Sequence, residues 1–413
     1  MKLIKTSLYT GASTAITFIS GFIVTKVVAV KIGPEGIAYV GQFQNTVTIF
    51  ALVSTGLIGA GVIKYIAQFY DDVPKQHRVI ETGYKIVLLS SVLASIIVLL
   101  TSSWLSKIAF HSTEFTDIYL LYGLFIIIMA LNTFFSNVLN GLKLIPKLTL
   151  VNIIGSLSGI IYTVFFAYKW GVKGVLVAAN FTALTVFIVN LFFLRKLDAI
   201  KWKPDFLKWD KEILRLFSGF ILMSLMSFLL PFTQLIIRDT IIKNYSVDEA
   251  GYWQAVTKIS DYYLAFITTV IGVYYMPRLS EIKDKAELRH EILSAYKIIM
   301  PVVTVMAFAI WLFRGLIVKI LFAPQFEPML PLFKYQLLGD VLKIASWLLA
   351  YLMIAKAKTK LFITTELIFT GSYVLFSLLF INRFGVIGAT YAFFLNYLLY
   401  SISIFFILRK NIV

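Results

Sequence analysis

Apolar residues run along this chain in long stretches that short polar segments separate. A helix of about 20 apolar residues is long enough to cross the hydrocarbon core of a bilayer. The pattern predicts twelve spanning helices joined mostly by short loops. They cover residues 7–31, 37–64, 82–103, 117–140, 148–168, 174–194, 213–240, 251–276, 292–313, 331–353, 361–381 and 386–408.

Composition agrees with this pattern. Hydrophobic residues make up 59% of the chain and charged residues 14%, and the mean hydropathy is +0.86. Soluble domains carry about 25% charged residues. We therefore expect an all-α polytopic membrane protein. The chain has no cysteine, and its three histidines fall in predicted loops without other ligands nearby, so we expect neither disulfides nor a metal site.

The two halves of the chain resemble each other. The central loop, residues 195–212, is the longest, and it separates an N-terminal lobe (1–194) from a C-terminal lobe (213–413). Six spans lie between equivalent positions, and six is even, so both repeats have the same orientation. We expect two six-helix lobes related by a pseudo-two-fold axis along the membrane normal, with a central cavity between them. The matching segments, TGYKIV with SAYKII, KIAF with KILF and WGVKG with FGVIG, are 82–87 with 294–299, 107–110 with 319–322 and 170–174 with 384–388.

The formal net charge of +17 has a clear distribution. Most Lys and Arg residues fall in loops on the side of the N-terminus, as cytoplasmic loops of membrane proteins do. We therefore expect both termini in the cytoplasm. This distribution explains the positive charge without binding to nucleic acid, so we expect no nucleic-acid partner. The basic central loop is expected to contact anionic membrane lipids.

Charged and amide side chains occur inside two apolar spans. Residues 251–276 carry Gln254, Lys258 and Asp261 on one helical face, and residues 331–353 repeat this arrangement with Asp340 and Lys343. A charge at the middle of a spanning helix costs about 2.5–3.5 kcal/mol, so these faces should line protein or a water-filled cavity. If the two helices pack together, Lys258 could meet Asp340 and Asp261 could meet Lys343. Such pairs could equally be neutral structural bridges.

The candidate chemistry is recognition of an anion. Lysine and arginine bind phosphate oxygens, amides suit sugar hydroxyls, and buried carboxylates can exchange protons. We expect no catalytic residue and no cofactor other than a proton or monovalent cation gradient. The candidate binding residues are Lys26, Lys64, Arg238, Gln254, Lys258 and Lys343, and the candidate coupling or charge-pairing residues are Asp239, Asp261, Asp340 and Glu366.

Several stretches resemble Wzx-type flippases of the multidrug/oligosaccharidyl-lipid/polysaccharide exporter superfamily. The resemblance implies twelve helices around a cationic cavity, and it points to the same Lys26, Lys64, Lys258, Asp261, Asp340 and Lys343, with Arg238 and Glu366 in less similar surroundings. The stretches, SLYTGAST, KVVAVKIGPEG, KYIAQFY, WQAVTKISDYYLAFIT, GDVLK and IAKA, are 7–14, 26–36, 64–70, 253–268, 339–343 and 354–357.

The resemblance also implies a function. An inner-membrane protein of this kind moves an undecaprenyl-diphosphate-linked oligosaccharide, either an O-antigen repeat unit or the enterobacterial common antigen lipid (lipid III), from the cytoplasmic to the periplasmic leaflet. A polysaccharide polymerase and a chain-length regulator are expected partners. A multidrug/cation antiporter of the same superfamily is an alternative, although organic cations favour an acidic cavity. A membrane polymerase or ligase is a second alternative, which the short outer loops disfavour.

Overall fold

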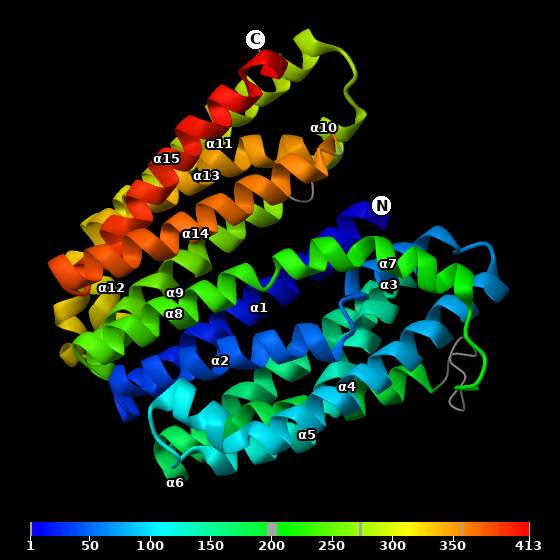
Figure 1. Ribbon diagram of the computed structural model, residues 1–413, viewed down its shortest axis with the longest axis horizontal. Coiled ribbons are helices and arrows are strands. Elements are labelled where there is room, and N and C mark those ends of the chain that lie inside the picture. Colours follow the sequence, from blue (N-terminus) through cyan, green and yellow to red (C-terminus); the bar gives the residue numbers. More distant parts are fainter. Residues whose placement is uncertain (1, 196–204, 272–274, 357, 413) are drawn as a thin grey trace. The chain divides into compact units, whose positions relative to one another are not determined.

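The computed structural model describes residues 2–195, 205–271, 275–356 and 358–412, and in these residues all regular structure is helical (Figure 1). The N-terminal part contains α1 (Lys2–Lys31), α2 (Pro34–Ser54), α3 (Gly59–Gln68), α4 (Val73–Phe110), α5 (Thr116–Gly141), α6 (Ile145–Leu194) and α7 (Lys211–Met226). The rest contains α8 (Leu229–Asn244), α9 (Val247–Val270), α10 (Met276–Glu281), α11 (Lys285–Leu312), α12 (Arg314–Leu321), the 3-10 helix η2 (Pro324–Leu332), α13 (Phe333–Ala355), α14 (Thr359–Phe384) and α15 (Ile387–Ile412).

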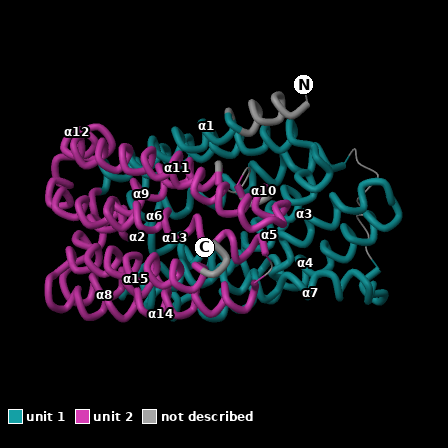
Figure 2. The backbone as a smooth tube through the Cα atoms, turned by 90° about the horizontal axis from the view of Figure 1, so that it is seen from above, with its two compact units in different colours: residues 1–32, 39–232 teal, residues 33–38, 233–413 magenta. Residues whose placement is uncertain are grey.

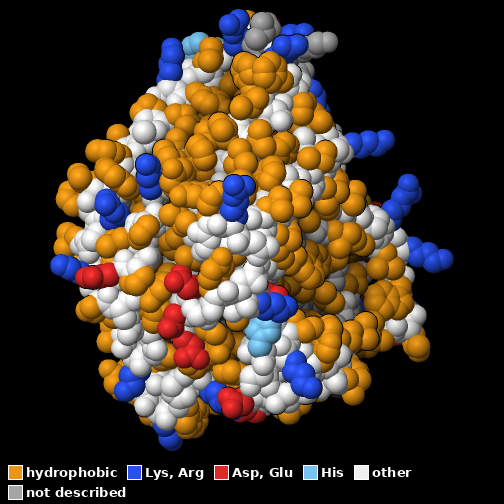
Figure 3. All heavy atoms as spheres, turned by 60° about the vertical axis from the view of Figure 1, so that its left-hand side comes forward, with side chains coloured by type: hydrophobic (Ala, Val, Ile, Leu, Met, Phe, Trp, Pro, Cys, Tyr) orange, Lys and Arg blue, Asp and Glu red, His pale blue; other side chains and the backbone are white. Residues whose placement is uncertain are grey.

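These helices confirm the twelve predicted spans. In the described residues, nine helical stretches are long and apolar enough to cross a membrane, and α2 with α3 forms a tenth that bends by 48°. One of the nine, α6, contains two spans, because Gly171 interrupts its 50 residues with φ 58° and ψ −134°. The twelfth span is α9, which is less apolar because it carries Gln254, Lys258 and Asp261. Figure 3 shows one face of the molecule, on which hydrophobic side chains predominate.

The chain divides into two units, shown in Figure 2. Unit 1 comprises residues 1–32 and 39–232, and unit 2 comprises residues 33–38 and 233–413. The division falls between residues 232 and 233, beyond the predicted linker 195–212, because α7 packs on α3 and α4. Residues 196–204 of that linker lie outside the described part of the chain.

Unit 1 has its hydrophobic core among α3, α4, α5, α6 and α7. Val62, Phe134 and Phe217 are each at most 1% exposed and belong to the same buried cluster. The core therefore includes Phe217 of α7, and this contact explains why α7 belongs to unit 1.

Unit 2 includes a six-residue segment from the N-terminal half of the sequence. Ala38, in the first turns of α2, is fully buried in one cluster with Ile237 and Trp253. Gly251 has no room for a side chain, since a Cβ there would lie 2.1 Å from the carbonyl oxygen of Pro34. Residues 33–38 are thus an integral part of unit 2.

The predicted internal repeat has a structural counterpart in one turn. Gly171 in unit 1 and Gly385 in unit 2 both have positive φ, 58° and 77°. Three residues later, a Cβ on Gly174 would lie 2.0 Å from the carbonyl oxygen of Phe166, and one on Gly388 would lie 2.1 Å from that of Phe380. WGVKG and FGVIG therefore form the same tight connection between two antiparallel spans.

Proline explains a helix break. Pro231 has no N–H to donate to the carbonyl of residue 227, and α7 ends at Met226 before α8 begins at Leu229. By contrast, Pro301 lies inside α11, which continues from Lys285 to Leu312. A proline inside a predicted span therefore breaks the helix in one case only.

Candidate functional site

The polar face predicted in residues 251–276 lies on α9. Gln254, Lys258 and Asp261 are four and three residues apart, so they share one side of the helix. Gln254 is buried, Lys258 is partly exposed and Asp261 is exposed. Because an exposed carboxylate in a spanning helix is unfavourable against lipid, we expect this face of α9 to line protein or a polar cavity.

Arg238 of α8 lies behind this face. Its side chain is fully buried. The guanidinium donates a hydrogen bond through Nη2 to Oε1 of Gln254, and it lies 5.7 Å from the ring of Trp253. Arg238 is also close enough to Lys258 for the two positive charges to repel each other. Two cations from neighbouring helices thus lie in one polar region.

Asp340 of α13 is fully buried and hydrogen-bonded. The hydroxyl of Tyr263 donates to Oδ2 over 2.9 Å, and the amide of Gln336 donates to Oδ1 over 3.4 Å. Tyr263 comes from α9, so this contact joins the two helices that carry the predicted polar faces. Both carboxylate oxygens of Asp340 therefore accept hydrogen bonds from side chains of the protein itself.

Lys343, one turn further along α13, lies among aromatic rings. Its ammonium is 4.9 Å from the ring centroid of Trp347, 5.9 Å from that of Tyr397 and 6.0 Å from that of Phe393. Rings at this distance attract a cation through their electron-rich faces. Among the described residues, aromatic rings rather than a direct ion pair surround this positive charge.

The carboxylate of Asp261 lies in the region of the lysines from both helices. Lys343 of α13 and Lys258 of α9 are both close enough to act electrostatically on Asp261. Lys258 also interacts with Arg238. The described hydrogen-bond partners of Asp340 are Tyr263 and Gln336, and its pairing with Lys258 stays a prediction.

Glu366 of α14 extends the polar region to α15. Its Oε1 accepts a hydrogen bond of 2.9 Å from the hydroxyl of Tyr400. Tyr373 and Tyr397 lie near the carboxylates of this region. The sequence analysis did not identify these tyrosines as site residues. Their hydroxyl groups in otherwise apolar helices could have indicated that they line a polar region.

Three candidates lie elsewhere. Lys26 is partly exposed on α1, and Lys64 is exposed on α3, with its ammonium 5.1 Å from the ring of Tyr65. Both belong to unit 1, whereas the region around Asp340 lies wholly within unit 2. Asp239 pairs locally with Lys243 of the same helix, at 2.8 Å. We name the unit 2 group the polar network; its members are Arg238, Gln254, Lys258, Asp261, Tyr263, Gln336, Asp340, Lys343, Glu366, Tyr373, Tyr397 and Tyr400.

The polar network has the chemistry of a transport site. It offers cations for phosphate, hydroxyls and amides for sugars, and carboxylates for protons. Across the residues that the structure describes, no three His, Asp or Glu side chains come together as ligands for a metal ion.

Comparison with known proteins agrees with these features. A model of the polysaccharide biosynthesis protein family matches residues 43–331. The Lipid III flippase of Escherichia coli (strain K12) is 31% identical over 402 residues, 97% of this chain and 96% of that protein. A putative O-antigen transporter of Shigella flexneri is 24% identical over 343 residues, 79% of this chain and 78% of that protein.

Solved structures share the fold. An inward-facing multidrug resistance MATE family transporter of the MOP superfamily has a TM-score of 0.79 at 16% identity, with 97% of this chain and 94% of that chain covered. A MOP superfamily transporter from Pyrococcus furiosus, described as having a binding pocket of reverse polarity, has a TM-score of 0.73 at 17% identity, with 99% and 95% covered.

The fold and the charged interior define a multi-pass membrane protein with the architecture of MOP-superfamily transporters, twelve spans in two lobes. Within that class, the family model covers more than half of the chain, and the relative from Escherichia coli matches nearly all of it. The chain belongs to the polysaccharide biosynthesis protein family, in its branch of Wzx-type flippases.

Proposed function

We propose that this protein is a flippase for a lipid-linked oligosaccharide. The observation that supports this most strongly is the polar network, which holds three cations among hydroxyl and carboxylate groups inside spanning helices. The relatives named as a Lipid III flippase and as an O-antigen transporter act on substrates of this kind. The substrate is an undecaprenyl-diphosphate-linked oligosaccharide, either an O-antigen unit or lipid III.

Each part of the substrate has a matching environment. Arg238, Lys258 and Lys343 attract the diphosphate, because guanidinium and ammonium groups form charge-assisted hydrogen bonds with its oxygens. Gln254 and the tyrosine hydroxyls suit the sugar hydroxyls. The polyprenyl tail stays in lipid, where its apolar surface is stable. Alternating exposure of the binding groups then moves the headgroup across the bilayer.

The proposal includes coupling to a proton or monovalent cation gradient. Asp261 is suited to this task, because it is exposed yet lies in a spanning helix beside two lysines. Asp340 and Glu366 are alternative carriers. The protein acts in the bacterial inner membrane with both termini in the cytoplasm, and delivers its substrate to a polymerase and chain-length regulator in the periplasmic leaflet.

The test measures which leaflet holds the substrate. Right-side-out vesicles from a deletion strain are treated with a membrane-impermeant sugar-modifying reagent. We expect the lipid-linked sugar to be protected, and the cloned gene to restore labelling. Lys258→Glu and Lys343→Glu should fail to restore it at normal membrane abundance. Lys334→Glu is the matched control, since Lys334 is an exposed lysine on the same helix as Lys343.

Equal labelling with and without the protein would contradict the flippase proposal. Increased drug susceptibility of the deletion strain in that case would favour a multidrug antiporter. Normal labelling in the Lys258→Glu and Lys343→Glu variants would leave the flippase proposal intact and remove those lysines from the binding site.

A further inference from the structure

A short turn before α7, residues 205–209, is fixed to one end of α4. Lys208 donates its backbone N–H to the carbonyl of Asp205 over 3.3 Å, and the carboxylate of Asp205 accepts the N–H of Leu207 over 3.0 Å. This hydrogen bond lowers the pKa of Asp205. The turn is therefore closed by its own backbone and by an aspartate.

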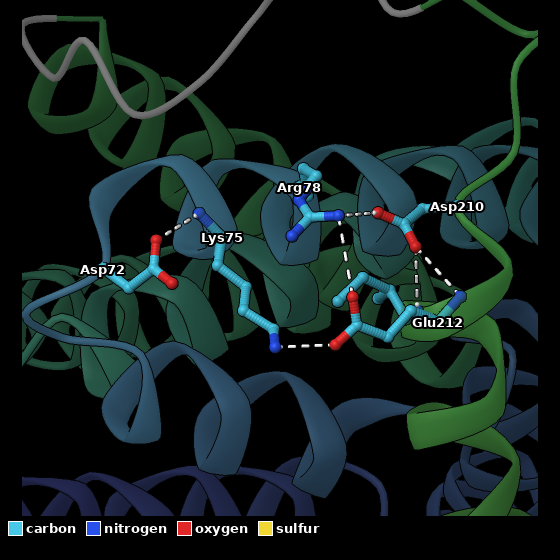
Figure 4. Close-up of polar contacts among 6 residues, drawn as sticks. Asp72, Lys75, Arg78, Asp210 and Glu212 are labelled. Atoms are coloured by element: carbon cyan, nitrogen blue, oxygen red, sulfur yellow. Dashed lines mark hydrogen bonds and ion pairs between the residues drawn. The ribbon is translucent and has the colours of Figure 1, made fainter.

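Ion pairs attach the start of α7, which directly follows this turn, to the first turns of α4 (Figure 4). Arg78 pairs with Asp210 at 3.0 Å, and Lys75 pairs with Glu212 at 2.6 Å. Asp210 also caps α7, because its Oδ1 accepts the N–H groups of Glu212 and Ile213. The start of α7 and the turn before it are thus held beside the first turns of α4.

The depth of the turn in the membrane follows from Lys85. This lysine is the last charged residue before residues 86–106, a run of 21 residues without a charge or histidine. Such a run spans about 31 Å as a helix, close to the thickness of the hydrocarbon core. Lys85 therefore marks its boundary. Its ammonium donates to the carbonyl of Lys208 over 2.9 Å, so the turn lies at the same depth.

Apolar side chains of the turn are exposed at this depth. Leu207 is 94% exposed, Phe206 39% and Trp209 37%. Lys208 extends away with its side chain 88% exposed. Aromatic residues are enriched at the boundary between headgroups and acyl chains, and lysine reaches from there to the headgroups. The sequence from 195 to 215 has seven Lys and Arg against four Asp and Glu, which complements an anionic bilayer surface.

We propose that residues 205–209 are an interfacial membrane anchor, which inserts Leu207 and Phe206 between the lipids of one leaflet. The anchor holds the end of α4 and the start of α7 at a fixed depth through the Arg78–Asp210 and Lys85–Lys208 contacts. Its partner is the lipid surface. The inference is independent of the substrate, so it holds or fails separately from the proposed flippase function.

The test uses the absence of cysteine from the chain. Leu207→Cys and, separately, Phe206→Cys are labelled with an environment-sensitive fluorophore in the full-length protein, reconstituted in vesicles of phosphatidylethanolamine and phosphatidylglycerol. We expect a blue-shifted emission that nitroxide-labelled lipids quench and that aqueous iodide does not. Asp71→Cys is the control, because Asp71 is exposed before the start of α4 and lies beyond the boundary marked by Lys85.

Arg78→Gln gives an independent test of the attachment. It breaks the pair with Asp210 and leaves the cap of α7 intact, so lipid quenching at residue 207 should decrease. Iodide quenching at both probe positions equal to that at residue 71 would overturn the proposal. Protection from both quenchers would mean that protein covers the turn, and would overturn it as well.

Discussion

At the scale of single residues, Asp340 shows how a charge is held in a membrane interior. Replacement by alanine would leave the hydroxyl of Tyr263 and the amide of Gln336 without their acceptor in a buried place. Each unmet group costs about 1–3 kcal/mol. We therefore expect Asp340→Ala to lower the free energy of unfolding by that order, and Asp340→Asn, which keeps an acceptor for Tyr263, to lower it less. Denaturant unfolding of the purified protein measures both. Equal loss in the two variants would contradict this account.

Arg238 depends on Gln254 in a similar way. Gln254→Leu removes the acceptor of a fully buried guanidinium, and a hydrogen bond to a charged group contributes about 1.5–3 kcal/mol. We expect a loss of stability of that size, seen as a lower unfolding midpoint in detergent. The control is Gln44→Leu, because Gln44 is exposed. If the two leucine variants unfold alike, the Arg238–Gln254 bond does not stabilise the protein.

The sequence was sufficient to locate the charges of the site but not their partners. Lys258, Asp261, Asp340 and Lys343 were conspicuous, because charges are rare in spanning helices. Whether Tyr263 or Lys258 contacts Asp340 depends on how α9 and α13 align. That alignment cannot be predicted from the positions of the charges in a single sequence.

Among the elements, the repeated turn between spans needs glycine at residues 174 and 388, because there is no room for a side chain at either position. A Cβ at residue 174 or 388 would lie about 2 Å from a carbonyl oxygen of the preceding span. Gly174→Ala and Gly388→Ala should each destabilise the protein by at least the 1–3 kcal/mol that overpacking usually costs. Thermal unfolding and membrane abundance measure this loss.

Gly159→Ala is the matched control for that prediction. The nearest atoms to a Cβ there are 3.7 Å away, and alanine favours helix over glycine by about 1 kcal/mol. We expect Gly159→Ala to be neutral or stabilising. A stable Gly388→Ala variant would show that the two turns are not equivalent.

Spanning helices were predictable because length and apolarity alone define them, and the described residues contain a helical stretch for each of the twelve. Interruptions inside spans were harder to predict. The bend between α2 and α3 occurs where Gly56 and Leu57 have φ of 62° and 59°. Glycine was a visible signal there, but positive φ at a leucine is set by packing rather than by preference.

At the scale of the whole molecule, contacts divide the chain differently from its repeat. The repeat suggested a boundary in the central loop, whereas α7 packs into unit 1 and residues 33–38 pack into unit 2. Periodicity and repeats describe the ancestry and length of each span. They do not predict which hydrophobic helix faces pack against each other, and this packing determines the two units.

Orientation in the membrane is the last property that the whole chain determines. The 38 residues of α4 extend about 57 Å, so its two ends emerge on opposite sides of a bilayer. The distribution of Lys and Arg predicts that the end at Asp71 is in the cytoplasm and the end at Glu114 outside. Single cysteines at these exposed positions are the only thiols in the protein. In cells with a permeabilised outer membrane, an impermeant maleimide should label Glu114→Cys and not Asp71→Cys, and lysis should expose both. Labelling of Asp71→Cys before lysis would reverse the assigned orientation, and the proposed direction of transport with it.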